Sequence, residues 1–411
     1  MTEKKQGLPL LSWILAVCCL MISCISFIMR GAWSTASQLG YESIGIGITQ
    51  IAVITSAYTL GSTISGFFSG LLTDLFGPKK ILGGVSICVA LLSFAIPFCP
   101  NYTTLLLVRF LSGFATGVFF AANMKVQVKA FPASNRAFIH GFVMTGPNLG
   151  LIISNAVFPT VILATGWEYV FYISAGMIFL IGVLFLVTFT MWSKQNPEVE
   201  FVASASGSAG NKEKMSLQEI IKAFARKNIL IGSFANFMFL GASTGISTYL
   251  IMYFTNEQGM DPVAAGGIIA SSSFIGLFVN SLAGILSDKL QSRKKVVIPG
   301  AALYALSIVG LISFKNVLLL TICIYLKDTS FLLATRPLNV LVAESADSKY
   351  VSTVSGVYNA FSNLGMSILP IVYGAVLSST NSYISAMWTA FAVVAAALAA
   401  IVFTKETYCK Q

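Results

Sequence analysis

Twelve apolar runs, each close to the length of a membrane-spanning helix, dominate this sequence and limit what it can fold into. A spanning helix needs about 20 mostly apolar residues. The runs cover residues 11–34, 46–72, 81–99, 104–126, 137–161, 168–192, 228–254, 262–286, 296–314, 317–342, 351–378 and 384–404. The sequence therefore predicts an all-α membrane protein with twelve transmembrane helices, and the even number of crossings places both chain ends on one side.

The charge content excludes a soluble protein. Only 10% of the 411 residues are charged, whereas soluble domains carry roughly 25%. The net charge of +10 does not indicate nucleic-acid binding, because no basic face with interleaved aromatic residues exists. His140 is the single histidine and no Cys-x-x-Cys pair occurs. We therefore expect no metal site and no cofactor.

The basic residues set the predicted orientation. If the N-terminus is cytoplasmic, the cytoplasmic segments hold 20 of the 25 Lys and Arg residues, as the positive-inside rule requires. We predict a multi-pass protein of the cell (plasma or inner) membrane with both termini in the cytoplasm. The longest polar stretch, 193–227, is rich in small residues and is predicted to be a cytoplasmic linker between helix bundles at 1–192 and 228–411.

A five-residue pattern occurs once in each half. Gly70-Leu-Leu-Thr-Asp74 follows the second run and Gly284-Ile-Leu-Ser-Asp288 follows the eighth. Glycine allows two helices to approach closely, and an aspartate at the membrane edge can accept hydrogen bonds from a helix N-terminus. The repeat indicates that the halves are copies of one another. The second copy lacks a glycine that matches Gly77.

This repeated loop resembles the signature loop of the major facilitator superfamily. Further similar segments are Arg109-Phe-Leu-Ser-Gly-Phe-Ala-Thr-Gly117, the 131–136 loop and the 166–171 loop. The resemblance implies the major facilitator fold, in which two pseudo-symmetric six-helix bundles surround a cavity and rock to give alternating access. It also implies gating or interbundle roles for Gly70, Asp74, Gly77, Gly284 and Asp288. Because only the first copy keeps Gly77, we expect the tighter interbundle contact at the Asp74 loop.

Charged residues inside the predicted spans are candidate functional residues, because burying charge in a membrane is costly. Arg30 resembles the helix-1 arginine of the anion:cation symporter family, whose members carry sugar acids and other organic anions. That resemblance implies a carboxylate ligand; the alternative is that Arg30 reaches the outer headgroups. Arg109 either binds substrate or bonds to helix-1 carbonyls. Lys327 and Asp328 either neutralise each other or act as an anion ligand and a proton carrier, and Arg336 is either a gate or a headgroup anchor.

The excess of basic over acidic residues within the spans predicts an electropositive cavity that attracts anions. It argues against an exporter of cationic drugs, which needs a carboxylate within the first bundle. Members of the symporter family that couple to protons carry acids where this chain has Met29 and Thr116. Proton coupling is thus left to Asp328, or the protein exchanges anions or works as a uniporter.

Several polar residues within the spans could complete a binding site, although for each alone a helix–helix hydrogen bond is the simpler role. They are Tyr58, Asn148, Asn236, Tyr249, Tyr358 and Asn359. We expect at least two to face the cavity. The predicted function is secondary transport of a small organic anion, a carboxylate or sugar acid, by proton symport or anion exchange.

The alternative is an exporter of drugs or amphipathic metabolites by proton antiport, supported by Gly146-Pro147 and by many aromatic residues. The chain shows no pattern of an enzyme: it has no nucleophile–base pair, and no phosphate-binding loop occurs. The expected partners are an anionic small molecule, the lipid bilayer and a coupling proton or counter-anion, and the protein is expected to be a monomer.

Overall fold

The computed structural model describes residues 9–197, 199, 226–346 and 351–406. Most of the 193–227 linker lies outside these described residues. All regular structure in the described part is helical. The N-terminal half contains α1 (Leu10–Leu39), α2 (Tyr41–Ile44), α3 (Ile48–Lys79), the π-helix η1 (Lys80–Val85), α4 (Ser86–Ala95), the 3-10 helix η2 (Ile96–Phe98), α5 (Tyr102–Gly117), α6 (Phe119–Ala130), α7 (Ala133–Met144), α8 (Gly146–Thr165) and α9 (Glu168–Gln195).

The C-terminal half repeats this plan with fewer interruptions. It contains α11 (Lys227–Met252), the π-helix η3 (Tyr253–Glu257), α12 (Pro262–Lys289), α13 (Lys294–Ser313), α14 (Val317–Glu344), α15 (Val351–Thr380) and α16 (Tyr383–Val402).

Twelve crossings fit within the eleven described segments that are long and apolar enough to span a membrane, because one segment contains two crossings. That segment, Ile48–Phe98, has 51 residues, and as one straight helix it would be about 75 Å long, against a hydrocarbon core of ~30 Å. The chain reverses at Gly77, whose φ of 75° and ψ of 152° are not helical. A positive φ favours glycine, so Gly77 permits the reversal between the second and third crossings.

The crossings match the predicted apolar runs, with two runs each divided between two α-helices. The run at 104–126 divides into α5 and α6 at Val118, and the run at 137–161 divides into α7 and α8 at Thr145. Pro147 lies in the first turn of α8, where its missing N–H removes no helical hydrogen bond. The all-helical, twelve-crossing fold class predicted from the sequence is confirmed.

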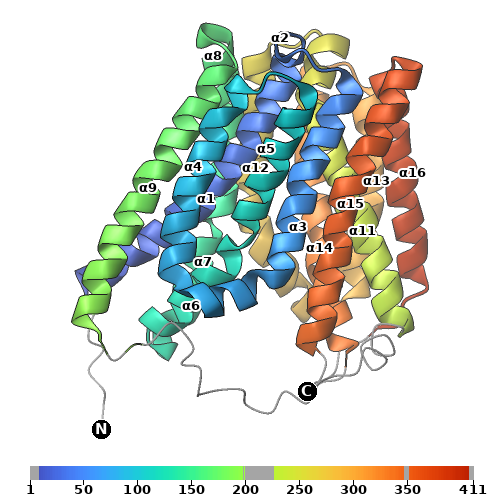
Figure 1. Ribbon diagram of the computed structural model, residues 1–411. Coiled ribbons are helices and arrows are strands. Elements are labelled where there is room, and N and C mark those ends of the chain that lie inside the picture. The colour runs from blue at the N-terminus through green and yellow to red at the C-terminus, as the bar shows by residue number, and fades with distance from the viewer. Residues whose placement is uncertain (1–8, 198, 200–225, 347–350, 407–411) are drawn as a thin grey trace.

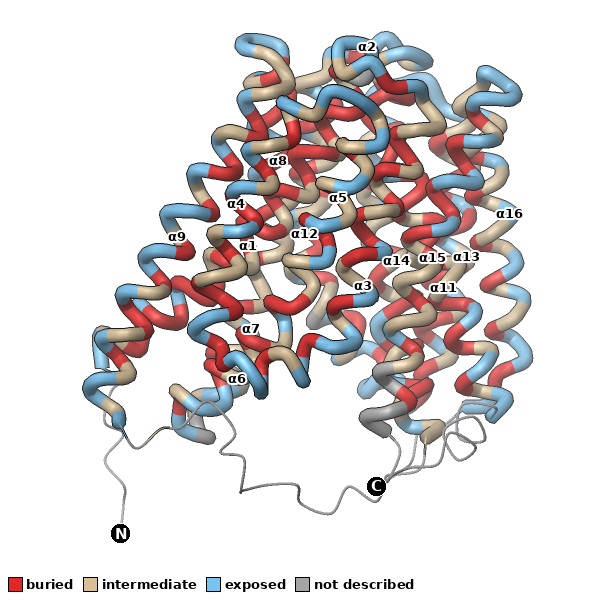
Figure 2. Tube along the Cα trace, in the orientation of Figure 1, coloured by how far each residue is buried: buried red, intermediate tan, exposed pale blue. Residues whose placement is uncertain are grey.

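Both ends of the described chain lie on the same face, which we call the terminal face (Figure 1). The other end of the bundles, where α1 ends at Leu39 and α15 ends at Thr380, is the opposite face. Large apolar side chains cover the outside, among them Phe67 at 71% exposure and Leu180 at 68%. Figure 2 shows buried positions gathered toward the interior of the helix assembly and exposed ones around it. This distribution suits lipid as the surrounding solvent.

Small residues bring equivalent helix pairs together in the two halves. Gly150 of α8 approaches the backbone of α1 at Cys24, and Gly365 of α15 approaches the backbone of α11 at Phe237. A side chain at either glycine would collide with the facing helix. Small residues are the usual means of close helix packing in membranes. They fix the first helix of each half, α1 and α11, which both contribute to the cavity described next.

Candidate binding cavity between the two halves

A cavity of about 360 Å³ lies between the two halves, within the size range of small-molecule sites. Its lining comes from α1, α3, α5 and α8 of the N-terminal half and from α11, α12, α14 and α15 of the C-terminal half. Seven of the residues predicted from the sequence line it: Arg30, Tyr58, Arg109, Asn148, Lys327, Asp328 and Arg336. The five charged residues singled out within the predicted spans therefore share one cavity.

Arg109 is held between two aromatic rings on the N-terminal wall. Its side chain is 1% exposed, and the guanidinium carbon lies 4.5 Å from the centre of the Tyr58 ring and 5.1 Å from that of Trp33. Cations are attracted to ring faces, most strongly where water is excluded. The Nε atom of Arg109 has no hydrogen-bond partner within the described structure. The rings thus fix the guanidinium in place and leave donor capacity unused.

The rings around Arg109 are themselves fixed by hydrogen bonds. The Tyr58 hydroxyl lies 2.9 Å from the Thr116 hydroxyl, and Trp33 Nε1 donates to Thr55 Oγ1 at 2.9 Å. Gly113 lies against the Tyr58 backbone and allows α5 to approach α3. Three helices therefore position one arginine.

Arg30 completes the N-terminal wall. It is half-buried and lines the cavity from α1. Neither Arg30 nor Arg109 forms an ion pair in the described part of the chain. The cavity lining contains a single carboxylate, that of Asp328, and it lies on the other wall.

The C-terminal wall carries its own counter-charge. Lys327 Nζ forms an ion pair with Asp328 Oδ1, and the Ser272 hydroxyl donates to Asp328 Oδ2 at 2.5 Å. The Lys327 side chain is 3% exposed and that of Asp328 is 27% exposed. Mutual neutralisation, one of the two interpretations left open by the sequence, is therefore present. Nearby, Arg336 Nε donates to Asn280 Oδ1 at 2.7 Å.

Four of the predicted polar residues are not among the cavity-lining residues. Asn236 Nδ2 donates to Ser362 Oγ at 2.8 Å, and the Tyr358 hydroxyl donates to Asn339 Oδ1 at 2.5 Å. Each of these bonds joins two helices of the C-terminal half. Tyr249 donates to the Ile48 carbonyl across the halves at 3.0 Å, and Asn359 is exposed. The geometry thus gives Asn236, Tyr249 and Tyr358 helix–helix contacts.

Gln38 joins the two halves near the opposite face. Its Oε1 accepts from the backbone N–H of Ile251 at 2.7 Å and of Met252 at 3.4 Å, and its Nε2 donates to the Ser247 carbonyl at 3.4 Å. Ile251 and Ser247 are four residues apart, so their groups would pair with each other in a regular helix. The Gln38 carboxamide therefore bonds to both the N–H and the C=O group of one backbone pair of α11. Together with the Tyr249–Ile48 bond, it fastens the halves on this side.

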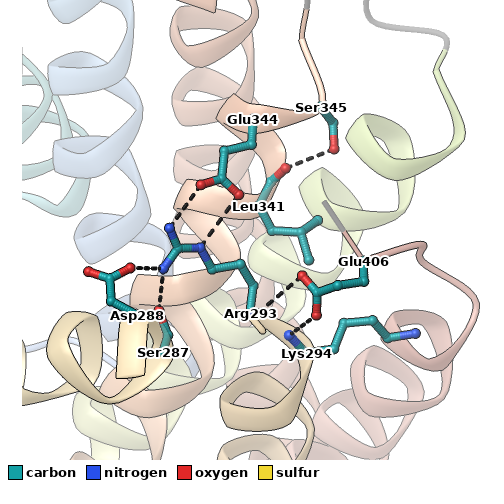
Figure 3. Close-up of polar contacts among 8 residues, drawn as sticks. All are labelled: Ser287, Asp288, Arg293, Lys294, Leu341, Glu344, Ser345 and Glu406. Atoms are coloured by element: carbon teal, nitrogen blue, oxygen red, sulfur yellow. Dashed lines mark hydrogen bonds and ion pairs between the residues drawn. The ribbon is translucent and has the colours of Figure 1, made fainter. Parts of the chain in front are cut away.

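The two repeated loops bond within their own halves. Asp74 forms an ion pair with Lys125 at 2.6 Å. Asp288 pairs with Arg293, which also pairs with Glu344 at 2.8 Å, and Figure 3 shows these three side chains converging. Hydrogen bonds to the Glu344 carboxylate hold the pKa of Arg293 above its usual value. The bonds described for these loops stay within each half in this arrangement, and those at Asp288 are the more extensive. The tighter interbundle contact expected at the Asp74 loop stays a prediction.

The sequence reasoning missed several lining residues, including Trp33, Gln38, Asn155, Ser272 and Asn280. Spacing could have identified Gln38, because it follows Arg30 by eight residues, about two helical turns, and so shares its face of the helix. The uninterrupted Ser271-Ser272-Ser273 within an apolar run was a second signal. Trp33 gave none, since a tryptophan in a span is equally consistent with lipid or core.

Comparison with known proteins gives a match of residues 16–370 to the family model of the Major Facilitator Superfamily. The "Hexuronate transporter" of Bacillus subtilis is 23% identical and aligns with 98% of this chain and 96% of its own length. The "Probable sulfoacetate transporter SauU" of Cupriavidus necator is 23% identical, covering 92% of this chain and 90% of its own. The "Probable galactarate/D-glucarate transporter GarP" of Escherichia coli K12 is 21% identical, covering 94% and 92%.

Solved structures agree on the fold. The crystal structure of the nucleoside transporter NupG superimposes with a TM-score of 0.77 at 14% sequence identity, covering 94% of this chain and 99% of that one. At this identity the similarity concerns the fold alone.

Proposed function

This chain belongs to the major facilitator superfamily, and we propose that it moves a small organic anion of the carboxylate or sugar-acid type across the membrane by alternating access. The observation that carries the proposal is the N-terminal wall of the cavity. Two arginines lie there without an acidic partner in the described structure, one of them with an unused donor. A buried cation without a counter-charge is costly, so an anionic ligand would stabilise this wall.

In this proposal the substrate carboxylate binds between Arg30 and Arg109. A planar guanidinium presents a fork of donors that matches a carboxylate. The Tyr58 and Trp33 rings limit the motion of Arg109, which lowers the entropy lost on binding. Asn148 and the hydroxyl-rich C-terminal wall then contact the remainder of the substrate. The names of the hexuronate, sulfoacetate and galactarate/glucarate relatives support an organic anion as the class of substrate.

We place the terminal face in the cytoplasm, on the strength of the basic residues in its loops. The structure then corresponds to a state closed toward the outside by Gln38 and Tyr249, with the halves spread apart toward the terminal face in Figures 1 and 2. In the alternate state these contacts break, and the Asp74 and Asp288 loops approach the other half. A single chain supplies both walls, so we propose that the monomer of the plasma or inner membrane is active.

Two modes of coupling fit the cavity. Met29 and Thr116 cannot carry protons, and Asp328 is the one carboxylate of the lining. Asp328 is already paired with Lys327 and accepts a hydrogen bond from Ser272, so both of its oxygens have partners within this wall. This pairing favours exchange of one anion for another over proton symport. A pH gradient imposed across proteoliposomes separates the two, because exchange of like anions requires only a counter-anion inside.

Uptake of labelled sugar acids into proteoliposomes tests the function. We expect uptake by the wild type and its loss in Arg30→Ala and Arg109→Ala. Arg136→Ala is a matched control, because Arg136 is exposed and does not line the cavity. Accumulation of hydrophobic cations with no response to organic acids would support the drug exporter instead. The paired state of Asp328 does not favour that alternative.

A further inference from the structure

We infer that Asp328 determines specificity within the proposed cavity by selecting hydroxylated acids with one carboxylate over acids with two. The inference rests on the proposed function and goes beyond it by assigning the number of charges on the substrate. It follows from the unequal charge of the two walls, the position of the Lys327–Asp328 pair, and the polar groups around that pair.

The walls differ in what they offer to an anion. Arg30 and Arg109 have no acidic partner in the described part of the chain, so the N-terminal wall has room for a carboxylate. On the C-terminal wall Lys327 is already paired, and the more exposed member of that pair is the anion Asp328. Arg336, the other cation of this wall, lies eight residues further along α14, about 12 Å along the helix axis, and donates to Asn280. A ligand that reaches across the cavity at the level of Asp328 therefore meets positive charge at one end and a carboxylate at the other.

The ion pair stays in place when the halves move. Lys327 and Asp328 are consecutive residues of α14, and the Ser272 bond to Asp328 comes from α12 of the same half. Rocking of the two halves about the cavity leaves contacts within one half unchanged. The charge of this wall is therefore the same in both access states, and it acts on the substrate during binding and release.

The groups beside the pair suit hydroxyls. The Ser243 and Ser273 hydroxyls line the cavity on this wall, and each can donate and accept hydrogen bonds. The partly exposed Asp328 carboxylate can accept a hydrogen bond from a substrate hydroxyl, which strengthens because the acceptor is charged. A substrate carboxylate in the same position offers no donor and is repelled. The wall thus accepts a terminal –CH2OH group and rejects a terminal –COO⁻ group.

Two pairs of open-chain acids isolate this one difference. D-Gluconate and D-glucarate, and D-galactonate and D-galactarate, differ only by a terminal –CH2OH in place of –COO⁻. Thermal-shift titration of the purified full chain gives an apparent Kd for each acid, because a ligand that binds the folded state raises the unfolding midpoint. We expect the wild type to bind at least one monoacid about tenfold more tightly than its diacid, the scale of repulsion between like charges a few ångströms apart.

Asp328→Asn removes the repulsion and frees Lys327. We expect it to shift the ratio of the two Kd values about tenfold or more toward the diacid. The Lys327→Met/Asp328→Asn double variant leaves no unpaired lysine that could impair folding. In this variant the preference for the monoacid should disappear, but no preference for the diacid should replace it. Asp261→Asn is the matched control, since Asp261 caps α12 outside the cavity lining, and its ratio should equal that of the wild type.

The outcomes separate this inference from the proposed function. If monoacids and diacids bind but Asp328→Asn leaves their ratio unchanged, or if the wild type prefers the diacids, the inference is wrong and organic-anion transport stands. If neither monoacid binds, the inference is also wrong. If no organic anion binds and none is taken up by proteoliposomes, the proposed function itself fails.

Discussion

The N-terminal half brings Arg30 and Arg109 to the cavity with no acidic side chain paired to them in the described structure, whereas the C-terminal half brings Lys327 already paired with Asp328. Both walls come from copies of one six-helix unit, so the fold does not dictate this difference. The difference in charge pairing arises from which residues occupy the cavity-lining positions of two helix bundles with the same fold. Under the proposed function, the N-terminal half holds the charge of the ligand, while the fixed Lys327–Asp328 pair of the C-terminal half shapes specificity.

The same contrast recurs at the repeated loops. In the N-terminal half Asp74 forms one ion pair with Lys125, and 61% of the Asp74 side chain is exposed. In the C-terminal half Arg293 bonds to both Asp288 and Glu344, and Glu406 accepts from the N–H groups of Arg293 and Lys294 at the start of α13 (Figure 3). The second loop lacks the glycine that reverses the chain at Gly77. Side-chain bonds thus fix the turn that glycine makes in the first copy.

The largest effect is expected from removing the unpaired arginine of the N-terminal wall. Arg109→Ala should lower uptake of a transported acid by at least about 100-fold, because charge-assisted bonds between a guanidinium and a carboxylate are lost. Arg109→Lys should fall in between, since lysine keeps the charge but loses the planar fork. Initial rates in proteoliposomes measure both. Rates for Arg109→Ala that match those of Arg136→Ala would remove the distinction between the walls.

The neutral pair of the C-terminal wall should show itself in stability. Lys327→Met leaves Asp328 without its cation and should lower the free energy of unfolding by roughly 1–3 kcal/mol, below the cost for a fully buried pair because Asp328 is 27% exposed. Adding Asp328→Asn should restore much of this loss, since no charge remains uncompensated. Thermal unfolding in detergent measures both variants. A double variant less stable than the single one would show that the two residues do not act as a pair.

The loops should differ in the same direction. Arg293→Ala breaks bonds to two carboxylates from a side chain that is 10% exposed, and should cost roughly 1–3 kcal/mol. Lys125→Ala removes one pair with a largely exposed partner and should cost less than about 1 kcal/mol. Unfolding midpoints measured under one set of conditions compare the two. Equal losses would contradict the more extensive bonding assigned to the second loop.

A smaller effect is expected where the halves are joined. Gln38→Leu removes the acceptor for the N–H groups of Ile251 and Met252, so exchange of these amide hydrogens should quicken severalfold. Hydrogen exchange read by mass spectrometry on peptides from α11 measures this. Gln38→Glu keeps the acceptor and should retain more of the protection. Unchanged exchange in Gln38→Leu would mean that this carboxamide does not hold the halves together at the opposite face.

The sequence was sufficient for the fold, because apolar runs and a repeated loop depend on residues close together in the chain. It also identified all the charged cavity residues, since charge inside a span is rare enough to stand out. It did not separate Tyr58, which lines the cavity, from Tyr358, which bonds to Asn339. The direction of a polar side chain depends on which helices lie beside it. Spacing from Arg30 indicates which face of α1 Gln38 occupies, but not its bonds across the halves, since those partners are backbone groups more than 200 residues away.

Binding of an acid compared with its neutral amide tests the central claim most directly. D-Gluconate and D-gluconamide differ only in the charged group that the arginine wall is proposed to hold. The account predicts that the wild type binds gluconate at least about tenfold more tightly than gluconamide, and that Arg109→Ala loses this preference while Arg136→Ala keeps it. Equal binding of acid and amide by the wild type, or an unchanged preference in Arg109→Ala, would contradict the account.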